Sequence, residues 1–279
     1  MEEKIDQIIK WIDNKTVKTA FRLTVNTDRK PELYDTKFGG VPYWPEEMEY
    51  PKAPDGTPLA LLAQLNMKDF SGNPLFPVKG ILQFFIAFDD IYGADFDMPD
   101  RQSGFRVVWH PDIREGITAE KVLSLGITTS INSWDEKEIY SPFNGEYAVD
   151  VKKTTVSMGP LDYRYEGYMN QGAEALGITL PEESGIYDIL SEEQYNQETE
   201  KNTGHWVNGY PYFTQNDPRE YRKELQYYDT LLFQMDSDFG RDNRYEIIWG
   251  DSGVAGFFIN HEDLKRRDFS KVLYNWDCC

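Results

Sequence analysis

Two short apolar runs dominate the hydrophobic pattern of this chain, and they are similar to each other. Residues 80–90 read Gly-Ile-Leu-Gln-Phe-Phe-Ile-Ala-Phe-Asp-Asp, and residues 253–263 read Gly-Val-Ala-Gly-Phe-Phe-Ile-Asn-His-Glu-Asp. Successive side chains of a strand point to opposite faces of its sheet, so the adjacent phenylalanines of each run need burial on both faces. The pattern predicts that each run is the central strand of a sheet-bearing unit.

The two runs are one of four pairs of matching segments. The pairs keep one order along the chain at a nearly constant separation of about 170 residues. Unrelated strands of similar composition would not keep that order, so the pattern predicts an internal duplication. The other three pairs are Gly39–Trp44 with Asn208–Phe213, Leu61–Asn66 with Leu231–Asp236, and Phe105–Trp109 with Val272–Trp276.

The remaining elements follow from periodicity and composition. Isoleucines at positions 5, 8, 9 and 12 have helical spacing between charged residues, which predicts an amphipathic helix over residues 2–14, packed on a sheet. In the strand at 61–66, strict alternation puts Leu62 and Gln64 on one face and Leu61 and Ala63 on the other. Further strands are predicted at 21–25, 105–109, 230–236, 245–249, 254–260 and 272–276, and further helices at 168–176, 184–200 and 262–267.

These elements predict an α+β fold. Antiparallel strands dominate it, and two similar sheet-bearing halves carry helices on the outside. We expect residues 1–150 to hold the N-terminal helix and the first repeat, residues 151–204 to form a helical acidic insertion, and residues 205–279 to form the second repeat. The three parts are expected to make one compact unit with pseudo-twofold symmetry.

The charge of the chain narrows its possible partners. Its 48 acidic residues against 29 basic ones give a net charge of −19. Such a field repels phosphate backbones and anionic membranes, so we expect no nucleic acid and no membrane as a partner. It would attract a basic protein.

The ends of the chain and its cysteines point to the cytoplasm. The start, Met1-Glu2-Glu3-Lys4, has no apolar segment typical of a secretion signal, and the apolar runs are too short for membrane spans. The two cysteines, Cys278 and Cys279, are adjacent and cannot staple a fold. No Cys/His spacing suggests zinc, so neither a metal nor a cofactor is predicted.

Four stretches carry a resemblance to a known family: Gly80–Phe85 with Asp89–Gly93, Phe213–Arg219, Trp249–Gly253 and the ending Asp268–Cys279. Over almost its whole length the chain resembles the YwqG-like family of uncharacterised bacterial proteins. The resemblance implies a cytoplasmic protein of Bacillus type, in a family with no established activity and no catalytic residues to carry over. The genomic neighbourhood of such proteins, near secreted-toxin loci, implies an immunity-like or partner-binding role.

Two motifs contain residue types that are used in catalysis or metal binding. Gly250-Asp251-Ser252-Gly253 spells the nucleophile loop of trypsin-like proteases, but no segment around a histidine matches the base that this chemistry needs. A tight turn before a strand is favoured. The turn from Asp236 to Asp242 carries three acidic residues that could hold calcium, but it lacks the EF-hand pattern, and a solvated turn is favoured.

The candidate binding residues lie in the repeated segments. Gln64 and Gln234 are amides inside apolar strands, so either they bond to neighbouring backbone or they line a shared cleft with Trp44 and Phe213. His205, beside Trp206 at the start of the second repeat, is the most interesting of the three histidines. These five residues, Trp44, Gln64, His205, Phe213 and Gln234, form the predicted binding set, and no catalytic residue is predicted.

The leading functional hypothesis is a non-enzymatic module that binds a basic protein through acidic and aromatic surface, in an immunity-like role. A hydrolase with an acidic, aromatic-lined cleft is the first alternative, and a passive structural domain is the second. A binder should show exposed aromatic side chains with an acidic rim, whereas an enzyme should show a pocket with converging titratable groups.

Overall fold

One ten-stranded sheet contains most of the strands of the protein, and its strand pairs are antiparallel. The computed structural model describes residues 2–136, 139–181, 185–240 and 243–278. The sheet order is β12-β11-β8-β7-β1-β6-β2-β3-β4-β5, and β9 pairs with β10 apart from it. The strands are β1 (Lys18–Asn26), β2 (Lys37–Gly39), β3 (Ala60–Asn66), β4 (Ile81–Ile86), β5 (Phe105–His110), β6 (Glu146–Val156), β7 (His205–Val207), β8 (Thr230–Asp236), β9 (Asp238–Phe239), β10 (Glu246–Ile247), β11 (Val254–Ile259) and β12 (Leu273–Asp277).

Helices and short 3-10 turns lie between the strands, and loops form the remaining connections. The helices are α1 (Glu2–Thr16), α2 (Ala119–Leu123), α3 (Tyr165–Leu176), α4 (Ile186–Ile189), α5 (Glu192–Glu200), α6 (Pro218–Tyr221) and α7 (His261–Arg266). The predicted α+β class with mainly antiparallel strands is confirmed. No helix in the described ranges is long and apolar enough to cross a membrane.

On both sides of the central strand pair, the neighbouring strands follow one another in the order in which they occur along the chain. The central pair, β1 with β6, runs antiparallel from Lys18 opposite Val156 to Asn26 opposite Ala148. Outward from β6 the order is β2, β3, β4 and β5, and outward from β1 it is β7, β8, β11 and β12. The matching segments of the sequence lie on or beside these strands in the same spatial order.

A bulge at the same place in both halves overturns strict alternation. Between β3 and β4, Leu61 pairs with Phe85 but Ala63 pairs with Phe84, so Leu62 is the extra residue. Leu62 therefore lies in the central core with Ala63, while Leu61 shares the other face with Gln64. The prediction that Leu62 and Gln64 share a face is wrong for this reason. The pairing of β8 with β11 shifts at the equivalent position, between Phe257 and Phe258.

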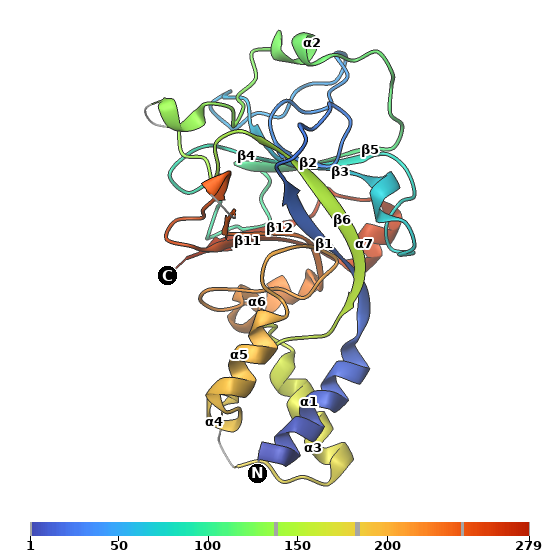
Figure 1. The fold of residues 1–279 in the computed structure, drawn as a ribbon, viewed down its shortest axis with the longest axis vertical. Helices are drawn as coiled ribbons and strands as arrows, with labels where there is room; N and C mark the ends of the chain where they lie inside the picture. The colour runs from blue at the N-terminus through green and yellow to red at the C-terminus, as the bar shows by residue number, and fades with distance from the viewer. Residues whose placement is uncertain (1, 137–138, 182–184, 241–242, 279) are drawn as a thin grey trace.

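The sheet curls into a nearly barrel-shaped layer, so that the inner faces of its two halves meet in one core (Figure 1). The ring centroids of Phe84 and Phe257, from the two central strands, are 5.0 Å apart. Phe105 of β5 lies 5.2 Å from Tyr274 of β12, which brings the two ends of the sheet together. The predicted central position of both Phe-Phe strands is confirmed, since every residue of β4 and β11 is buried.

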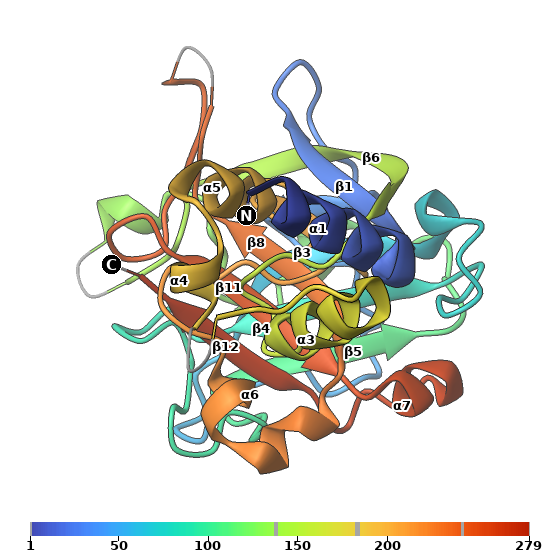
Figure 2. The same ribbon diagram turned by 90° about the horizontal axis from the view of Figure 1, so that it is seen from below.

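Helices α1, α3, α4 and α5 form a helical part that lies below the sheet in Figure 1. Figure 2 shows the molecule from below, with this helical part toward the viewer. There α1 packs against α3, and not on the sheet as predicted. The spacing of its isoleucines identified the buried face correctly but carried no information on the partner. Gly172 of α3 explains the close fit, because a Cβ there would lie 2.9 Å from Ile8 and 3.1 Å from Trp11.

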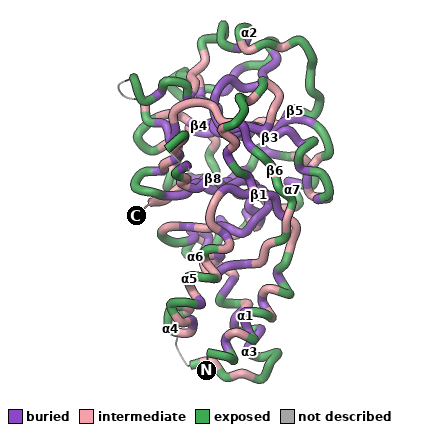
Figure 3. Tube along the Cα trace, viewed as in Figure 1, coloured by how far each residue is buried: buried purple, intermediate pink, exposed green. Residues whose placement is uncertain are grey.

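Strand β6 runs from Glu146 to Val156 and so includes residue 151, where the insertion is predicted to start. The helix predicted over 184–200 begins outside the described residues, and its described part is divided into α4 and α5. Ser191 starts α5 with a capping box, in which its hydroxyl accepts from the Gln194 N–H and the Gln194 side chain accepts from the Ser191 N–H. Figure 3 shows that burial concentrates in the sheet and that the connections and the tip of the helical part are mostly exposed.

Candidate functional site

Gln64 and Gln234 are fully buried and bond to backbone in matching ways. Each amide oxygen accepts from one backbone N–H, and each amide nitrogen donates to two backbone carbonyls. This satisfies the buried amides and fixes the segments on either side of the strands. The partners are Tyr43, Leu33 and Asp35 for Gln64, and Tyr212, Asn202 and Gly204 for Gln234, at 2.8–3.0 Å.

Trp44 and Phe213 are also buried. The Trp44 ring packs against Tyr50 and Phe85, and its Nε1 donates to the carbonyl of Met48 at 3.0 Å. Phe213 stacks on Phe258, with ring centroids 6.0 Å apart. Both residues cover the outer faces of the sheet, one in each half, so they neither meet in a shared cleft nor present a ring to a partner.

His205, on β7 between β1 and β8, is buried, and both of its ring nitrogens face polar groups. Nδ1 accepts the backbone N–H of Asp236 at 3.1 Å, which places the ring proton on Nε2. Nε2 faces the carboxylate of Asp238 at 3.3 Å, and this contact holds the pKa of Asp238 below its usual range. Because neither nitrogen keeps a free lone pair, His205 is placed to fix the β7–β8 connection and not to act as a base.

The other candidate catalytic or metal-binding residues lie apart from one another. His110 is buried against Gln83 at 2.8 Å, and burial lowers its pKa to about 4. Ser252 lies in the exposed turn before β11, with φ of 89°. In the turn from Asp236 to Asp242, residues 241 and 242 lie outside the described residues. Within the described ranges, no group of three or more histidine, cysteine or acidic side chains is placed to hold a metal.

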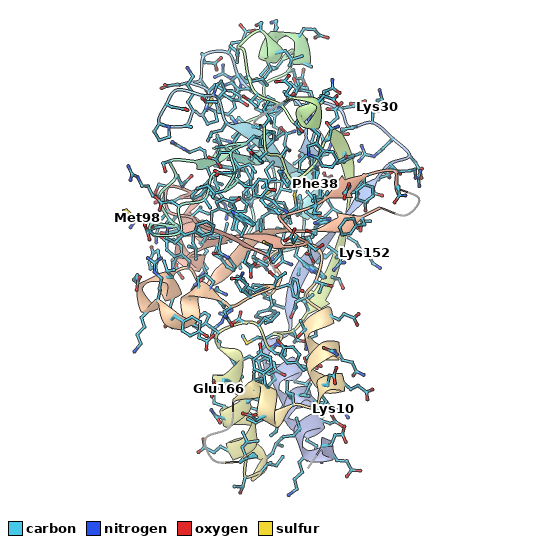
Figure 4. The ribbon with its side chains drawn as sticks, turned by 90° about the vertical axis from the view of Figure 1, so that its left-hand side faces the viewer. Lys10, Lys30, Phe38, Met98, Lys152 and Glu166 are labelled. Atoms are coloured by element: carbon cyan, nitrogen blue, oxygen red, sulfur yellow. The ribbon has the colours of Figure 1, made fainter. Side chains whose placement is uncertain are left out.

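The surface instead points to the connection between β4 and β5. This acidic loop, residues 89–104, exposes three large apolar side chains: Ile91 at 40%, Phe96 at 53% and Met98 at 52%. Figure 4 shows Met98 at the margin of the molecule, pointing outward. Five aspartates lie in the same loop, namely Asp89, Asp90, Asp95, Asp97 and Asp100.

The backbone of the acidic loop is held from several sides. Asp89 accepts from the Ile91 and Gly93 N–H groups at 3.2 and 2.7 Å, which forms a local turn. Arg222 donates to the carbonyls of Phe96 and Asp97 at 3.2 and 3.0 Å. The loop therefore presents its apolar side chains from a fixed backbone, which lowers the entropy that ordering would cost on binding.

Hollows flank the acidic loop on both sides. One, of about 600 Å³, is lined by Ala53, Asp89, Ile91 and Phe96, among others. The second, of about 460 Å³, lies between Met98 and the segment around Tyr227. Aspartates line both hollows, and Arg222 and Lys271 also line the second. Exposed apolar side chains beside such hollows suit a partner that inserts its own side chains into them.

A second acidic surface lies on the helical part but exposes a different kind of side chain. Tyr187 and Tyr221 are 67% and 69% exposed, and Glu192, Glu193 and Glu200 line a nearby hollow. The predicted insertion acids Glu182 and Glu183 lie outside the described residues. Tyrosine hydroxyls are solvated by water, whereas the side chains of Phe96 and Met98 gain nothing from exposure. The acidic loop is therefore the stronger candidate.

Sequence reasoning missed the acidic loop because its apolar residues have no period. They are single residues between aspartates in Asp-Asp-Ile-Tyr-Gly-Ala-Asp-Phe-Asp-Met-Pro-Asp, residues 89–100. That interleaving was the available signal, since a core segment would not place an acid at almost every second position.

One titratable group away from the loop gives a pH-dependent prediction. Burial raises the pKa of Asp277 to about 6, and its Oδ2 accepts the Gln215 N–H at 2.6 Å. A carboxyl with a raised native pKa destabilises the fold as it ionises, so stability should fall as the pH rises from about 4 to about 6. Asp277→Asn should raise the free energy of unfolding at pH 7 by on the order of 1 kcal/mol and change it little at pH 3.5. Urea titrations at both pH values measure this; an equal effect at both would contradict it.

Comparison with known proteins identifies a family for this chain. A search of curated proteins finds no match. The domain of unknown function DUF1963 matches residues 36–278, which include every strand of the main sheet except β1. The chain therefore belongs to the DUF1963 family.

Proposed function

We propose that this protein is a non-enzymatic binding module that recognises a basic protein partner through the acidic loop. One observation carries the proposal: Ile91, Phe96 and Met98 are exposed from one loop whose backbone is held in place and whose sequence interleaves them with aspartates. Aromatic and methionine side chains are enriched among the anchors of protein interfaces, and they gain most when a partner removes them from water.

The aspartates supply the charge preference. No described cation forms an ion pair with Asp90 or Asp97, and the nearby Arg222 donates to the carbonyls of Phe96 and Asp97 and pairs with Glu224. Their negative field adds to that of a chain with a net charge of −19. It would speed the approach of a basic partner, and the apolar side chains would then slow its dissociation.

Two finer proposals accompany this one. The YwqG-like resemblance supports a cytoplasmic bacterial protein with an immunity-like role, in which the basic partner is a toxin. The repeated order of strands, the shared bulge and the matching amide contacts of Gln64 and Gln234 support descent from an internal duplication.

A capture experiment with loop variants tests the proposed function. Immobilised wild-type protein and a Phe96→Ala/Met98→Ala variant are exposed to the same native lysate at low and high salt, and bound proteins are identified by mass spectrometry. We expect a basic protein that the variant retains at least tenfold less, a loss of about 1.4 kcal/mol or more. Phe239→Ala is the matched control, because Phe239 is 55% exposed on β9 and lies outside the loop.

The same experiment separates the alternatives. A partner retained equally by wild type and loop variant would overturn the proposed site. A passive structural domain would retain no protein that depends on the loop. Asp90→Asn/Asp97→Asn should weaken capture mainly at low salt, whereas Glu192→Gln/Glu193→Gln, on α5, should leave it unchanged.

A further inference from the structure

An apolar groove with a basic rim lies in the first half, away from the acidic loop. It has a volume of about 730 Å³, within the range of ligand sites. We call it the Trp109 groove. Its floor and walls include Phe76, Val78 and Trp109 with three prolines, and Val78 is 80% exposed. Figure 1 shows its main segment, between β3 and β4, beside α7.

The equivalent place in the second half is filled. There the indoles of Trp249 and Trp276 have centroids 6.3 Å apart, and the Tyr92 ring lies 5.2 and 4.9 Å from them. Trp276 is the equivalent of Trp109, because the two end matching segments. Trp249 is the equivalent of Phe76, because each lies four residues before the glycine that precedes the central strand, Gly253 or Gly80.

Close backbone approaches support this equivalence. A Cβ on Gly80 would lie 2.5 Å from the carbonyl oxygen of His110, and a Cβ on Gly253 would lie 1.9 Å from that of Asp277. The start of β4 thus lies against the last residue of β5, and the start of β11 lies against the last residue of β12. The comparison rests on the proposed duplication and not on the acidic loop.

The two places differ in the residue that the opposite half contributes. Tyr92 comes from the β4–β5 connection with φ of 51°, and Arg267 comes from the β11–β12 connection with φ of 62°. The Tyr92 ring packs against both indoles of its site, Trp249 and Trp276. Arg267 instead donates to the carbonyls of Leu75 and Leu264 and lines the edge of the Trp109 groove. A phenylalanine from the opposite half packs on the tryptophan in both places, with ring centroids 6.1 Å apart for Phe269 and Trp109 and 6.2 Å for Phe96 and Trp276. The Trp109 groove has no ring in the place of Tyr92.

The rim has the opposite charge to most of the protein. Lys79 and Arg267 line the groove, and the ammonium of Lys153 lies over Gly72 at its end. Against them stands Asp112, which pairs with Lys79 at 2.7 Å while both side chains are more than two-thirds exposed. Such an exposed pair contributes little and opens readily. A chain with a net charge of −19 therefore has a locally cationic, apolar site here.

We propose that the Trp109 groove binds an aromatic side chain presented by an acidic peptide segment of a partner protein. The filled counterpart supports this ligand class, since Tyr92 reaches its site from the acidic sequence Asp89-Asp90-Ile91-Tyr92. The aromatic ring would cover Val78 and Trp109, and the carboxylates would meet Lys79 and Arg267.

A peptide titration with the full chain tests the groove. The probe is the labelled peptide Asp-Asp-Ile-Tyr-Gly-Ala-Asp, the sequence of residues 89–95, read by fluorescence anisotropy at 0.15 M salt. We expect saturable binding below about 1 mM, weakened at least tenfold when the peptide tyrosine is alanine. Val78→Asp should weaken binding at least tenfold, Lys79→Gln about threefold, and the control Val17→Asp, at a residue 54% exposed, should not change it.

Several results would overturn the groove proposal. They are absence of binding up to about 1 mM, equal binding of a peptide with lysines in place of its aspartates, and binding that Val78→Asp leaves unchanged. Wild-type self-association that Val78→Asp abolishes would show a second copy of the chain to be the occupant instead. The Phe96→Ala/Met98→Ala variant should bind the peptide normally, so failure here and failure of the proposed function are distinguishable.

Discussion

Replacing Phe84 or Phe257 by alanine should lower the free energy of unfolding by about 3–5 kcal/mol. Both side chains are fully buried, and each packs on Phe233 as well as on the other, with ring centroids 4.8 to 6.0 Å apart. Truncation would leave a cavity where the two halves meet, and the sheet on both sides limits its collapse. Such a loss is a large fraction of the roughly 5–15 kcal/mol that stabilises a typical domain.

Urea denaturation followed by circular dichroism measures this effect. Phe239→Ala, on an exposed phenylalanine, is the control and should cost about 0.5 kcal/mol or less. Because Phe84 and Phe257 touch, the double variant should cost less than the sum of the single ones. A loss below about 1 kcal/mol for either single variant would contradict a shared core.

Replacing Arg219 by alanine should cost about as much, roughly 3–5 kcal/mol, for an electrostatic reason. The guanidinium is fully buried; it donates to both carboxylate oxygens of Asp217 at 2.9 and 2.6 Å and lies 4.3 Å from the Phe258 ring. Alanine would leave the buried carboxylate of Asp217 without its main partner. Nearby, Arg164 engages both oxygens of Asp162 in the same way.

The matched control for Arg219 is an arginine in an exposed ion pair. Arg244 pairs with Asp28 at 2.8 Å, but both side chains are exposed, so Arg244→Ala should cost about 0–1 kcal/mol. Thermal and urea unfolding of both variants give the comparison. Equal losses for the two arginines would show that burial of the Asp217–Arg219 pair is not what makes it matter.

The strands were predictable because their signals are local. Apolar runs placed β4 and β11, and the pair Gln64 and Gln234 indicated equivalent positions from sequence alone. The bulge at Leu62 was not predictable, because an extra residue changes the face of a side chain without changing the composition of the strand. The packing of α1 on α3 was likewise not predictable, because periodicity identifies the buried face of a helix but not the element that covers it.

Two of the predicted binding residues, Trp44 and Phe213, are buried in the structure. Trp44 and Phe213 follow prolines in turn-like segments, which suggested exposure, yet both segments fold back over the outer faces of the sheet. Phe96 and Met98 carry no periodic signal, and only the fixed backbone of the acidic loop shows that they face outward. A sequence reports how apolar a segment is, but exposure depends on whether another segment covers it.

Association kinetics with the captured basic partner test the central proposal most directly. The rate constants are measured between about 0.05 and 0.5 M salt, where the Debye length falls from about 14 to about 4 Å. We predict that salt, or Asp90→Asn/Asp97→Asn, slows association about tenfold or more with a smaller change in dissociation. Phe96→Ala/Met98→Ala should mainly speed dissociation. An association rate indifferent to salt, together with dissociation indifferent to the loop variant, would contradict recognition through the acidic loop.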